Sequence, residues 1–447
     1  MSDVTVIQPL VISAAKIIGS VLLLALVLWG VSKLSKIAKL DPEIGRKLVH
    51  ISLGLYCLTF PWVFEYAWEV AVMCLLAVGV FMLARGTMRA SLGGGLHSVK
   101  RISYGEILFA ASVALLFWLK DGHYILTAQH RPGVGPVLYV LPILILTLCD
   151  AASALVGSHY GRRVFRIEEG SKSIEGVVVF AATAWLVSLI VFLLLTDIGR
   201  GEVILLAFIT AVFGALLEAA SWRGLDNLFI PLGLYFLLSN LLHLGVLGLA
   251  GNAAIFFAAL LTLLYMTGRS GADRHFVAIG FTLFFCIDIF SGFLSLITPA
   301  LAVASYLACV RFMKLERPAH DGLTLLLVVF AIALGCFMVS NLGQLDMIYS
   351  FNLAFAALAA GIVARFARNW LVISGAIVMA WLAMSVRVVW LENASEAAWV
   401  FAALGAGGIV LVAAAGWYIR QRGFERPWVW LGGLSMAISL AALPVAP

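Results

Sequence analysis

The fold class is decided by residues 136–196, which read PVLYVLPILILTLCDAASALVGSHYGRRVFRIEEGSKSIEGVVVFAATAWLVSLIVFLLLT. Two apolar runs, 136–157 and 176–196, flank a polar stretch. Each run has the length of about 17–25 residues that a helix needs to cross a hydrocarbon core of roughly 30 Å. The runs are rich in Leu, Val and Ala without polar alternation, so they predict membrane helices and argue against a β-barrel.

Apolar runs of this kind recur from one end of the chain to the other. Of its 447 residues, 63% are hydrophobic and 12% are charged, whereas a soluble domain carries about 25% charged residues. We therefore expect an all-α, polytopic integral membrane protein with about sixteen transmembrane helices. The predicted spans are 9–31, 47–63, 66–84, 104–120, 136–157, 176–196, 202–220, 228–249, 252–267, 276–290, 292–310, 322–341, 346–364, 370–386, 398–418 and 428–445.

Basic residues gather in the odd-numbered connections between these spans. The first connection holds Lys33, Lys36, Lys39, Arg46 and Lys47, and the fifth holds Arg162, Arg163, Arg166 and Lys172. The positive-inside rule makes these connections cytoplasmic and predicts that both termini lie outside, in a membrane of the bacterial inner-membrane type. The net charge of +6 is no sign of nucleic-acid binding, since the position of positive charges matters more than their sum in such a protein.

The polar motifs are confined to the first half of the chain. The dense ones all lie between residues 41 and 231, and the chain from about 250 onward reads as spans and short loops. We therefore expect a membrane-embedded catalytic domain over 1–248 and an additional transmembrane helical domain of unknown role over 249–447.

Asp150 stands near the inner end of the predicted span 136–157. An aspartate at the centre of a transmembrane helix costs roughly 2.5–3.5 kcal/mol on insertion scales, and less near the interface, so it is a candidate functional residue. The alternative is a buried partner for an arginine or a lysine. The small residues that follow, Gly157 and Gly161 among them, either let helices approach closely or leave room for a ligand.

Ser171, Lys172 and Ser173 close the polar stretch just before the next span. An ammonium group flanked by hydroxyls at a helix start suits phosphate, because charge, O–H donors and free backbone N–H groups converge there. Glu175 follows, where it could hold Lys172, a metal or a nucleotide sugar. The stretch is not a P-loop, since Ser171 stands where GxxxxGK[ST] requires glycine. The preceding arginines are better explained as cytoplasmic anchors.

A third polar stretch, residues 218–231, contains Glu218, Asp226 and Asn227. By the sidedness argument it lies on the same membrane face as Asp150 and Lys172. Several carboxylates and an amide at one face suit a hard cation such as Mg²⁺, which usually bridges to phosphate. The alternative is that Asp226 caps a helix and Glu218 is a solvated acid.

Arg46, Lys47 and His50 occupy one turn at the inner end of the second predicted span. One explanation is that Arg46 and Lys47 anchor the helix at the membrane interface, with His50 playing no special role. The other is that the basic residues bind phosphates and that His50 lies near the lipid acceptor. Glu106 enters the fourth span and requires a partner or a polar cavity.

Together these stretches resemble the CTP-dependent phytol kinase and dolichol kinase (polyprenol kinase) family, which is related more distantly to the phosphatidate cytidylyltransferases. The motifs are RKLVH (46–50), RISYGE (101–106), DAASALVGSHYG (150–161), SKSIEG (171–176) and EAASWRGLDNLFIP (218–231), and the resemblance covers about residues 41–245. It implies phosphoryl transfer from CTP to a lipid alcohol, such as phytol or a polyprenol, within the membrane. It also implies a nucleotide–metal site made of Asp150, Lys172, Glu175, Asp226 and Asn227.

We therefore predict a Mg²⁺-assisted lipid-alcohol kinase that acts at the cytoplasmic membrane face. The catalytic candidates are Asp150, Lys172, Asp226 and His50, and the metal candidates are Asp150, Asp226 and Glu218. The nucleotide-binding candidates are Arg46, Lys47, Gly157, Gly161, Ser171, Lys172, Ser173, Glu175 and Asn227. The proton acceptor is either an aspartate or His50. The alternatives are a CTP-using cytidylyltransferase that makes a CDP-lipid, and a lipid or ion transporter.

Overall fold

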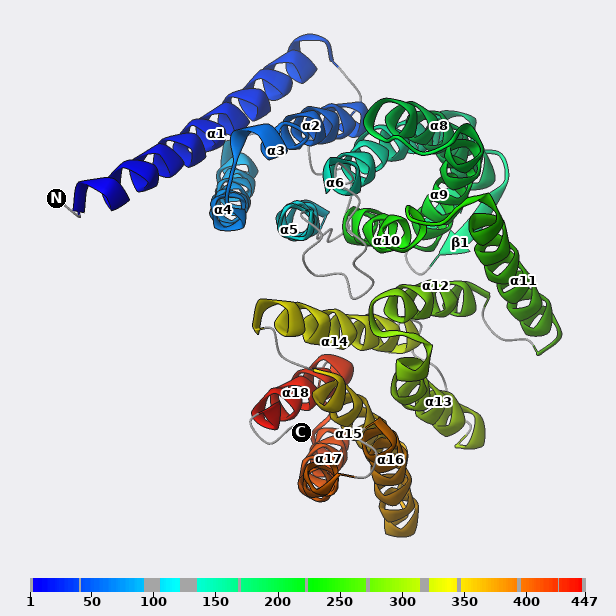
Figure 1. Cartoon of the computed structure of the whole chain (residues 1–447). Helices are drawn as coiled ribbons and strands as arrows, with labels where there is room; N and C mark the ends of the chain where they lie inside the picture. The colour runs from blue at the N-terminus through cyan, green and yellow to red at the C-terminus, as the bar shows by residue number, and fades with distance from the viewer. Residues whose placement is uncertain are drawn as a thin grey trace. The chain divides into compact units, whose positions relative to one another are not determined.

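The chain forms two compact helical units, residues Met1–Thr262 and Leu263–Pro447. The computed structural model describes residues 3–39, 42–91, 105–120, 135–167, 170–221, 224–270, 274–313, 321–343, 347–391, 395–424 and 426–443 (Figure 1). The units divide inside helix α11 (Val246–Ser270), somewhat later than the boundary near 248 predicted from the sequence. The separate roles given to the two domains stay a prediction.

The first unit contains all the polar motifs. Its elements are α1 (Asp3–Ile37), α2 (Pro42–Cys57), α3 (Phe60–Val63), α4 (Ala67–Ser91), α5 (Gly105–Leu119), α6 (Gly135–Leu144), the π-helix η1 (Ile145–Cys149), α7 (Asp150–Tyr160), β1 (Val164–Ile167), β2 (Gly170–Ser173), α8 (Ile174–Leu195), α9 (Arg200–Ala220), α10 (Asp226–Leu241) and the first part of α11. Arg101 lies outside the described residues.

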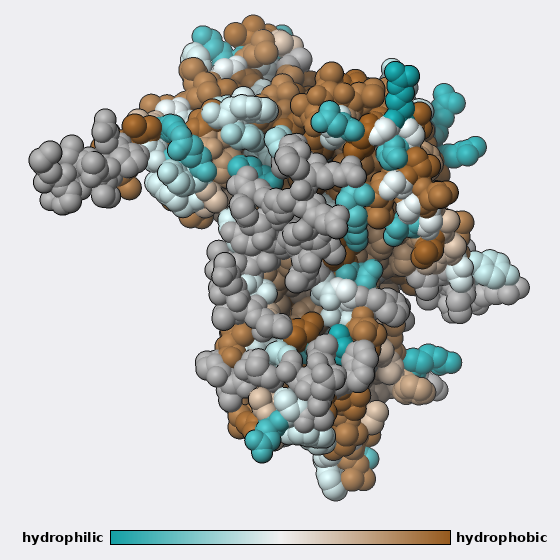
Figure 2. All heavy atoms as spheres, in the orientation of Figure 1, coloured by the Kyte–Doolittle hydropathy of each residue, from teal (hydrophilic) through white to brown (hydrophobic). Residues whose placement is uncertain are grey.

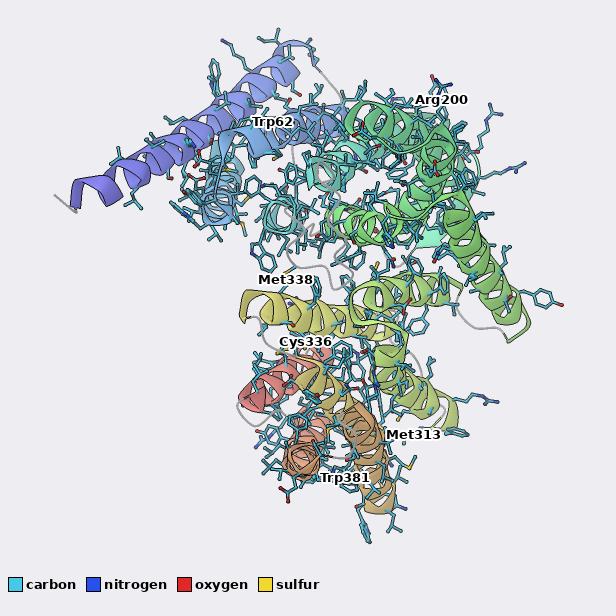
Figure 3. The ribbon with its side chains drawn as sticks, viewed as in Figure 1. Trp62, Arg200, Met313, Cys336, Met338 and Trp381 are labelled. Atoms are coloured by element: carbon cyan, nitrogen blue, oxygen red, sulfur yellow. The ribbon has the colours of Figure 1, made fainter. Side chains whose placement is uncertain are left out.

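The second unit is helical in every element that the structure describes. Its elements are α12 (Arg274–Ser291), the 3₁₀ helix η2 (Phe293–Leu296), α13 (Ile297–Phe312), α14 (Asp321–Gly343), α15 (Ile348–Phe366), α16 (Trp370–Leu391), α17 (Glu396–Arg422) and α18 (Pro427–Ala441). Helix α15 is its core, because nearly all its residues are buried and it packs against α13, α16, α17 and α18. Trp381 of α16, labelled in Figure 3, donates its indole N–H to Ala402 O of α17 at 2.8 Å.

The structure confirms a helical membrane protein, but it does not support the count of sixteen spans. Among the described residues, nine helical segments are long and apolar enough to cross a membrane, and five shorter apolar helices accompany them. The predicted spans 47–63 and 228–249 correspond to α2 and α10, each of which has 16 residues. Such a helix rises only about 24 Å, less than a hydrocarbon core of roughly 30 Å.

Apolar side chains cover much of the outside of both units, as expected for surfaces that face lipid. On α8, for example, Leu193 is 60% exposed and Leu194 is 75% exposed. Figure 2 shows hydrophobic residues over much of the visible face, with hydrophilic residues scattered between them. Helices satisfy their own backbone hydrogen bonds, which is why apolar segments of this composition adopt them in lipid.

Segments α6, η1 and α7 form one continuous helical rod from Gly135 to Tyr160, with a π-helical turn just before Asp150. Pro142 lies inside α6, three residues before this turn, and lacks the N–H that a regular helix would use there. Asp150 therefore lies within the rod, and its predicted place near the inner end of a membrane span stays a prediction. The rod continues for about 15 Å beyond it at 1.5 Å per residue.

A short antiparallel hairpin joins this rod to α8. Strands β1 and β2 pair Val164 with Ser173 and Phe165 with Lys172. Ser173 then caps α8, since its hydroxyl accepts the backbone N–H of Gly176 at 3.1 Å. Serine is a favoured residue at this position, because it satisfies an amide that the first helical turn leaves free. The hairpin and cap fix where the Lys172 side chain enters the helix bundle.

Candidate active site

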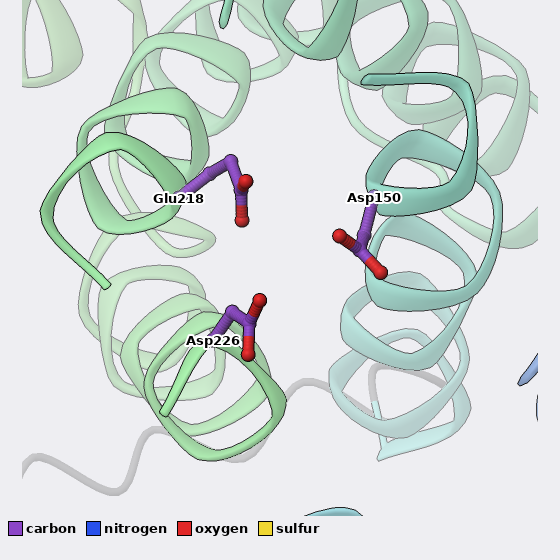
Figure 4. A group of neighbouring side chains, drawn as sticks. All are labelled: Asp150, Glu218 and Asp226. Carbon is purple, nitrogen blue, oxygen red and sulfur yellow. The ribbon is translucent and has the colours of Figure 1, made fainter. Parts of the chain in front are cut away.

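Three carboxylates from separate helices meet in the first unit. Asp150 begins α7, Glu218 lies in the last turn of α9, and Asp226 begins α10. One carboxylate oxygen from each residue lies within 4.8 Å of one from each of the others, with Asp150 and Glu218 buried and Asp226 partly exposed. Figure 4 shows the three side chains pointing toward a common centre. The shared face predicted for these acids therefore corresponds to a compact cluster.

Lys47 neutralises one of these acids directly. Its ammonium group lies 2.7 Å from Asp150 Oδ2, and both side chains are almost fully buried. The same ammonium reaches the Asp150 backbone carbonyl at 3.4 Å. The sequence predicted Lys47 as a nucleotide ligand and left open a buried basic partner for Asp150; the structure identifies Lys47 as that partner. A buried charge requires such a partner because its desolvation costs several kcal/mol.

Lys172 forms the second ion pair of the site, with Glu218. Its ammonium lies 2.7 Å from Glu218 Oε1 and also donates to the Glu218 backbone carbonyl. Burial lowers the pKa of Lys172, but the neighbouring Glu218 and Asp226 carboxylates raise it by more, so the pKa lies above its ordinary value. Lys172 is therefore a fixed positive charge at neutral pH, as a phosphate-binding lysine must be.

The cluster has the chemistry that a divalent cation requires. Three carboxylates and two ammonium groups leave a formal charge of about −1, and hard cations such as Mg²⁺ prefer oxygen ligands. Glu218 Oε2 is buried and has no hydrogen-bond partner within the described part of the chain. An unpaired buried carboxylate oxygen is costly in a folded protein. A cation shared with Asp150 and Asp226 would satisfy it, so the residues present fit Mg²⁺.

His50 lies beside Asp150 but is bonded elsewhere. Its Nε2 atom lies 3.1 Å from the carbonyl oxygen of Leu146 in η1 and 3.6 Å from Asp150 Oδ2. Phe109 of α5 contacts the imidazole ring edge-on, with a centroid distance of 5.4 Å. The histidine predicted as a catalytic candidate is thus at the site, held against a backbone carbonyl.

Asn227 and Glu175 support the site through backbone contacts. The Asn227 amide donates to the Gly105 carbonyl at 2.9 Å, which ties the start of α5 to the start of α10. The Asn227 backbone N–H donates to Asp226 Oδ1 at 3.0 Å. Glu175 accepts the Arg163 backbone N–H at 3.2 and 3.3 Å and so clasps the hairpin. Their predicted roles in nucleotide binding stay predictions.

Gly157 and Gly161 occupy a tight contact between α7 and the start of α8. A Cβ atom on Gly157 would lie 3.0 Å from Ser173 Oγ, and one on Gly161 would lie 2.3 Å from a backbone carbonyl oxygen and 2.7 Å from Ser173 Cβ. Close packing, one of the two explanations that the sequence allowed, accounts for both glycines.

The remaining candidates are mostly exposed to solvent. Ser171 and Arg46 are exposed, as are Arg162 and Arg163, and Glu106 is half-buried. Sequence reasoning missed the π-helical turn and the use of the Leu146 carbonyl. The one local signal was Pro142, because a proline inside a helix disturbs the hydrogen bonds around it.

The fold and the site define a class: a helical membrane protein in which carboxylates and lysines meet where α9 ends and α10 begins. A phytol kinase from Synechocystis sp. is 32% identical to the chain over 220 residues, which cover 49% of the chain and 86% of that relative. The chain therefore belongs to the phytol kinase family, whose members are transferases that act as kinases on a lipid alcohol.

Two other comparisons gave no match. No family model matches the chain, and no solved structure matches it. The relative corresponds to about half of the chain, so the rest has no counterpart in it.

Proposed function

We propose that this chain transfers the terminal phosphoryl group of CTP to an isoprenoid alcohol, such as phytol or a polyprenol. The observation that carries the proposal is the meeting of Asp150, Glu218 and Asp226 within 4.8 Å, beside the buried ammonium groups of Lys47 and Lys172. Phosphoryl transfer needs little covalent help from a protein, but it does need positioning and neutralisation of negative charge. Membership in the phytol kinase family supports the same reaction class.

The carboxylates are proposed as the ligands of Mg²⁺. Asp150, Glu218 and Asp226 would hold the ion, and its chemistry would be to neutralise the oxygens of the transferring phosphoryl group. The buried and unpaired Glu218 Oε2 supports this assignment.

Of the two lysines, Lys172 is proposed to act on the nucleotide and Lys47 to hold a carboxylate of the cluster. A nucleoside triphosphate brings about four negative charges, more than enough to compete with one carboxylate for the Lys172 ammonium group. Lys172 sits on the hairpin and keeps its charge, so we assign it to the phosphates that transfer and leave. Lys47 lies deeper against Asp150, and its role is to hold that carboxylate in place. CTP as the donor comes with the family resemblance.

The lipid alcohol is proposed to reach the site from the bilayer. Its chain would lie along apolar helix faces, while its hydroxyl group reaches the cluster where α9 ends and α10 begins. We also propose that this end of the helices faces the cytoplasm. The exposed Arg162 and Arg163 beside the hairpin support that orientation through the positive-inside rule.

The test is an assay of the purified protein with labelled nucleotides and a panel of lipid alcohols. CTP labelled at the γ-phosphate should yield a labelled lipid phosphate with an isoprenoid alcohol, and CTP labelled at the α-phosphate should not. A lipid labelled only from the α-phosphate would instead establish a cytidylyltransferase. Equal use of ATP would overturn the donor assignment, and the absence of any labelled lipid across the panel would overturn the proposal.

A further inference from the structure

One face of α2 packs against the π-helical turn that precedes Asp150. Lys47, His50 and Gly54 are spaced so that they share this face. They contact Asp150, Leu146 and Thr147 in turn. The contact at Gly54 is very close, since a Cβ atom there would lie 2.7 Å from Thr147 Cβ. Helix α2 therefore contacts two residues of the turn and the aspartate that directly follows it.

The π-helical turn makes the position of Asp150 depend on such support. An α-helix bonds each N–H to the carbonyl four residues earlier, whereas a π-helix shifts this to five and is found mostly as single turns, often at functional sites. A single residue of shift rotates the following side chain by about 100° around the helix axis. Whether the turn over Ile145–Cys149 is kept therefore decides where the Asp150 carboxylate points.

The hydrogen bond between His50 and this turn determines which ring nitrogen carries the hydrogen. Its Nε2 atom lies 3.1 Å from Leu146 O, and a carbonyl oxygen can only accept, so Nε2 must carry the hydrogen. The Asp150 carboxylate is farther from the same atom, at 3.6 Å. Nε2 is the ring atom that faces Asp150, and a nitrogen that carries a hydrogen has no free lone pair to accept another. It cannot take a proton from an alcohol while this hydrogen bond is made.

We propose that His50 is a positioning residue, which donates its Nε2–H to Leu146 O and so holds the π-helical turn that aims Asp150 at Glu218 and Asp226. The proton of the acceptor alcohol then passes to a carboxylate of the cluster and not to His50. This inference rests on the proposed function for its kinetic consequences, but the geometry of the carboxylates can be measured without catalysis.

The test compares three substitutions of His50 with a matched histidine control. Glutamine places an amide N–H close to the position of Nε2, whereas the shorter asparagine cannot reach Leu146 O and alanine has no donor. His159 is the control, because its ring also contacts a helical carbonyl, Leu155 O at 3.0 Å, but on the exposed part of α7. The measurements are Mn²⁺ affinity by electron paramagnetic resonance and kcat and KM for CTP, all on purified full-length protein.

We expect H50A and H50N to lose about 10–100-fold in Mn²⁺ affinity and in kcat, the range typical of residues that orient metal ligands. H50Q should recover most of both losses, and H159A should behave as the wild type. If H50A proves unstable, the comparison of H50Q with H50N carries the same information, since both side chains are neutral amides.

Two results would overturn the proposal. If H50Q were as inactive as H50A while both bound Mn²⁺ as the wild type does, His50 would be the proton acceptor. If all the variants matched the wild type, the turn would not need His50. A wild-type protein that transfers no phosphate, with the Mn²⁺ affinities ordered as expected, would refute the proposed function and leave the positioning role supported.

Discussion

Single residues set the charge balance of the site, and the Lys47–Asp150 pair is its most buried part. Both side chains are under 10% exposed and their charged atoms lie 2.7 Å apart. The attraction between two buried charges offsets the cost of their desolvation only while both are present. Removing one member of a buried pair therefore costs about 3–5 kcal/mol. Removing both charges costs much less, because no uncompensated ion remains.

This balance predicts a specific pattern of stabilities. K47M alone should destabilise the protein by about 3–5 kcal/mol, whereas K47M/D150N should regain most of that loss. Thermal unfolding of the detergent-solubilised variants measures both effects. If the loss of stability in K47M/D150N equalled the sum of the losses in K47M and in D150N, the two side chains would not interact.

Substitution of Lys172 should have a different outcome and affect catalysis, because its charge is proposed to act on the nucleotide. K172M should lower kcat by about 100-fold or more, the effect of removing one stabilising group from a transition state. The matched control is K16M, since Lys16 also pairs with a glutamate, Glu65 at 3.9 Å, but Glu65 is 73% exposed whereas Glu218 is 8% exposed. An equal loss of activity in both variants would show that the effect is not specific to the site.

At the scale of elements, the site depends on how α2 and the hairpin meet the rod that carries Asp150. The apolar runs predicted the helices closely, as with 176–196 for α8 (Ile174–Leu195) and 202–220 for α9 (Arg200–Ala220). The run 228–249 was predicted as one span, but the chain breaks between α10 and α11 at Leu242 to Gly245. Hydrophobicity alone does not reveal so short a break.

The π-helical turn could not be predicted, because nothing in ILTLC (145–149) distinguishes it from an α-helical turn. It is contacted by His50 and Gly54 of α2, about a hundred residues earlier in the chain. The same is true of Lys47, which is separated from Asp150 by 103 positions. The sequence predicted that the acids share one membrane face, but the pairing of each acid with a particular lysine requires the tertiary fold.

The packing of α2 on this turn makes Gly54 a sensitive position. In G54A the new Cβ would lie 1.9 Å from Thr147 Oγ1 and 2.7 Å from Thr147 Cβ, so α2 or the turn must move. We expect a loss of about 1–3 kcal/mol in unfolding free energy and a clear fall in kcat. G79A on α4 is the control, because nothing lies within 4 Å of its added atom. Wild-type kcat in G54A would mean that the site tolerates a shift of α2.

At the scale of the whole molecule, the first unit carries the site and the second unit has no assigned role. The second unit is built around the buried helix α15, and the relative from Synechocystis sp. matches only about half of the chain. The number of membrane crossings beyond the nine supported helices, and the side on which each terminus lies, stay predictions.

Sidedness can be tested at the two ends of α8, a helix of 22 residues that rises about 33 Å. We expect R163C to react with a membrane-impermeant maleimide only in inside-out vesicles, and D197C only in right-side-out vesicles. The native cysteines, all of which the structure describes, are buried and should react little. The reverse pattern would place the site on the outer face, and labelling of both positions from one side would contradict α8 as a span.

The Asp150 cluster is proposed to transfer phosphate to a lipid alcohol. The most direct test is the transfer of γ-label from CTP to an isoprenoid alcohol by the wild type, by D150N and by K47M/D150N, with folding checked for each. We expect a labelled lipid phosphate from the wild type and none above background from either variant, although the double variant stays folded. Turnover by a folded Asp150 variant within tenfold of the wild type would contradict it.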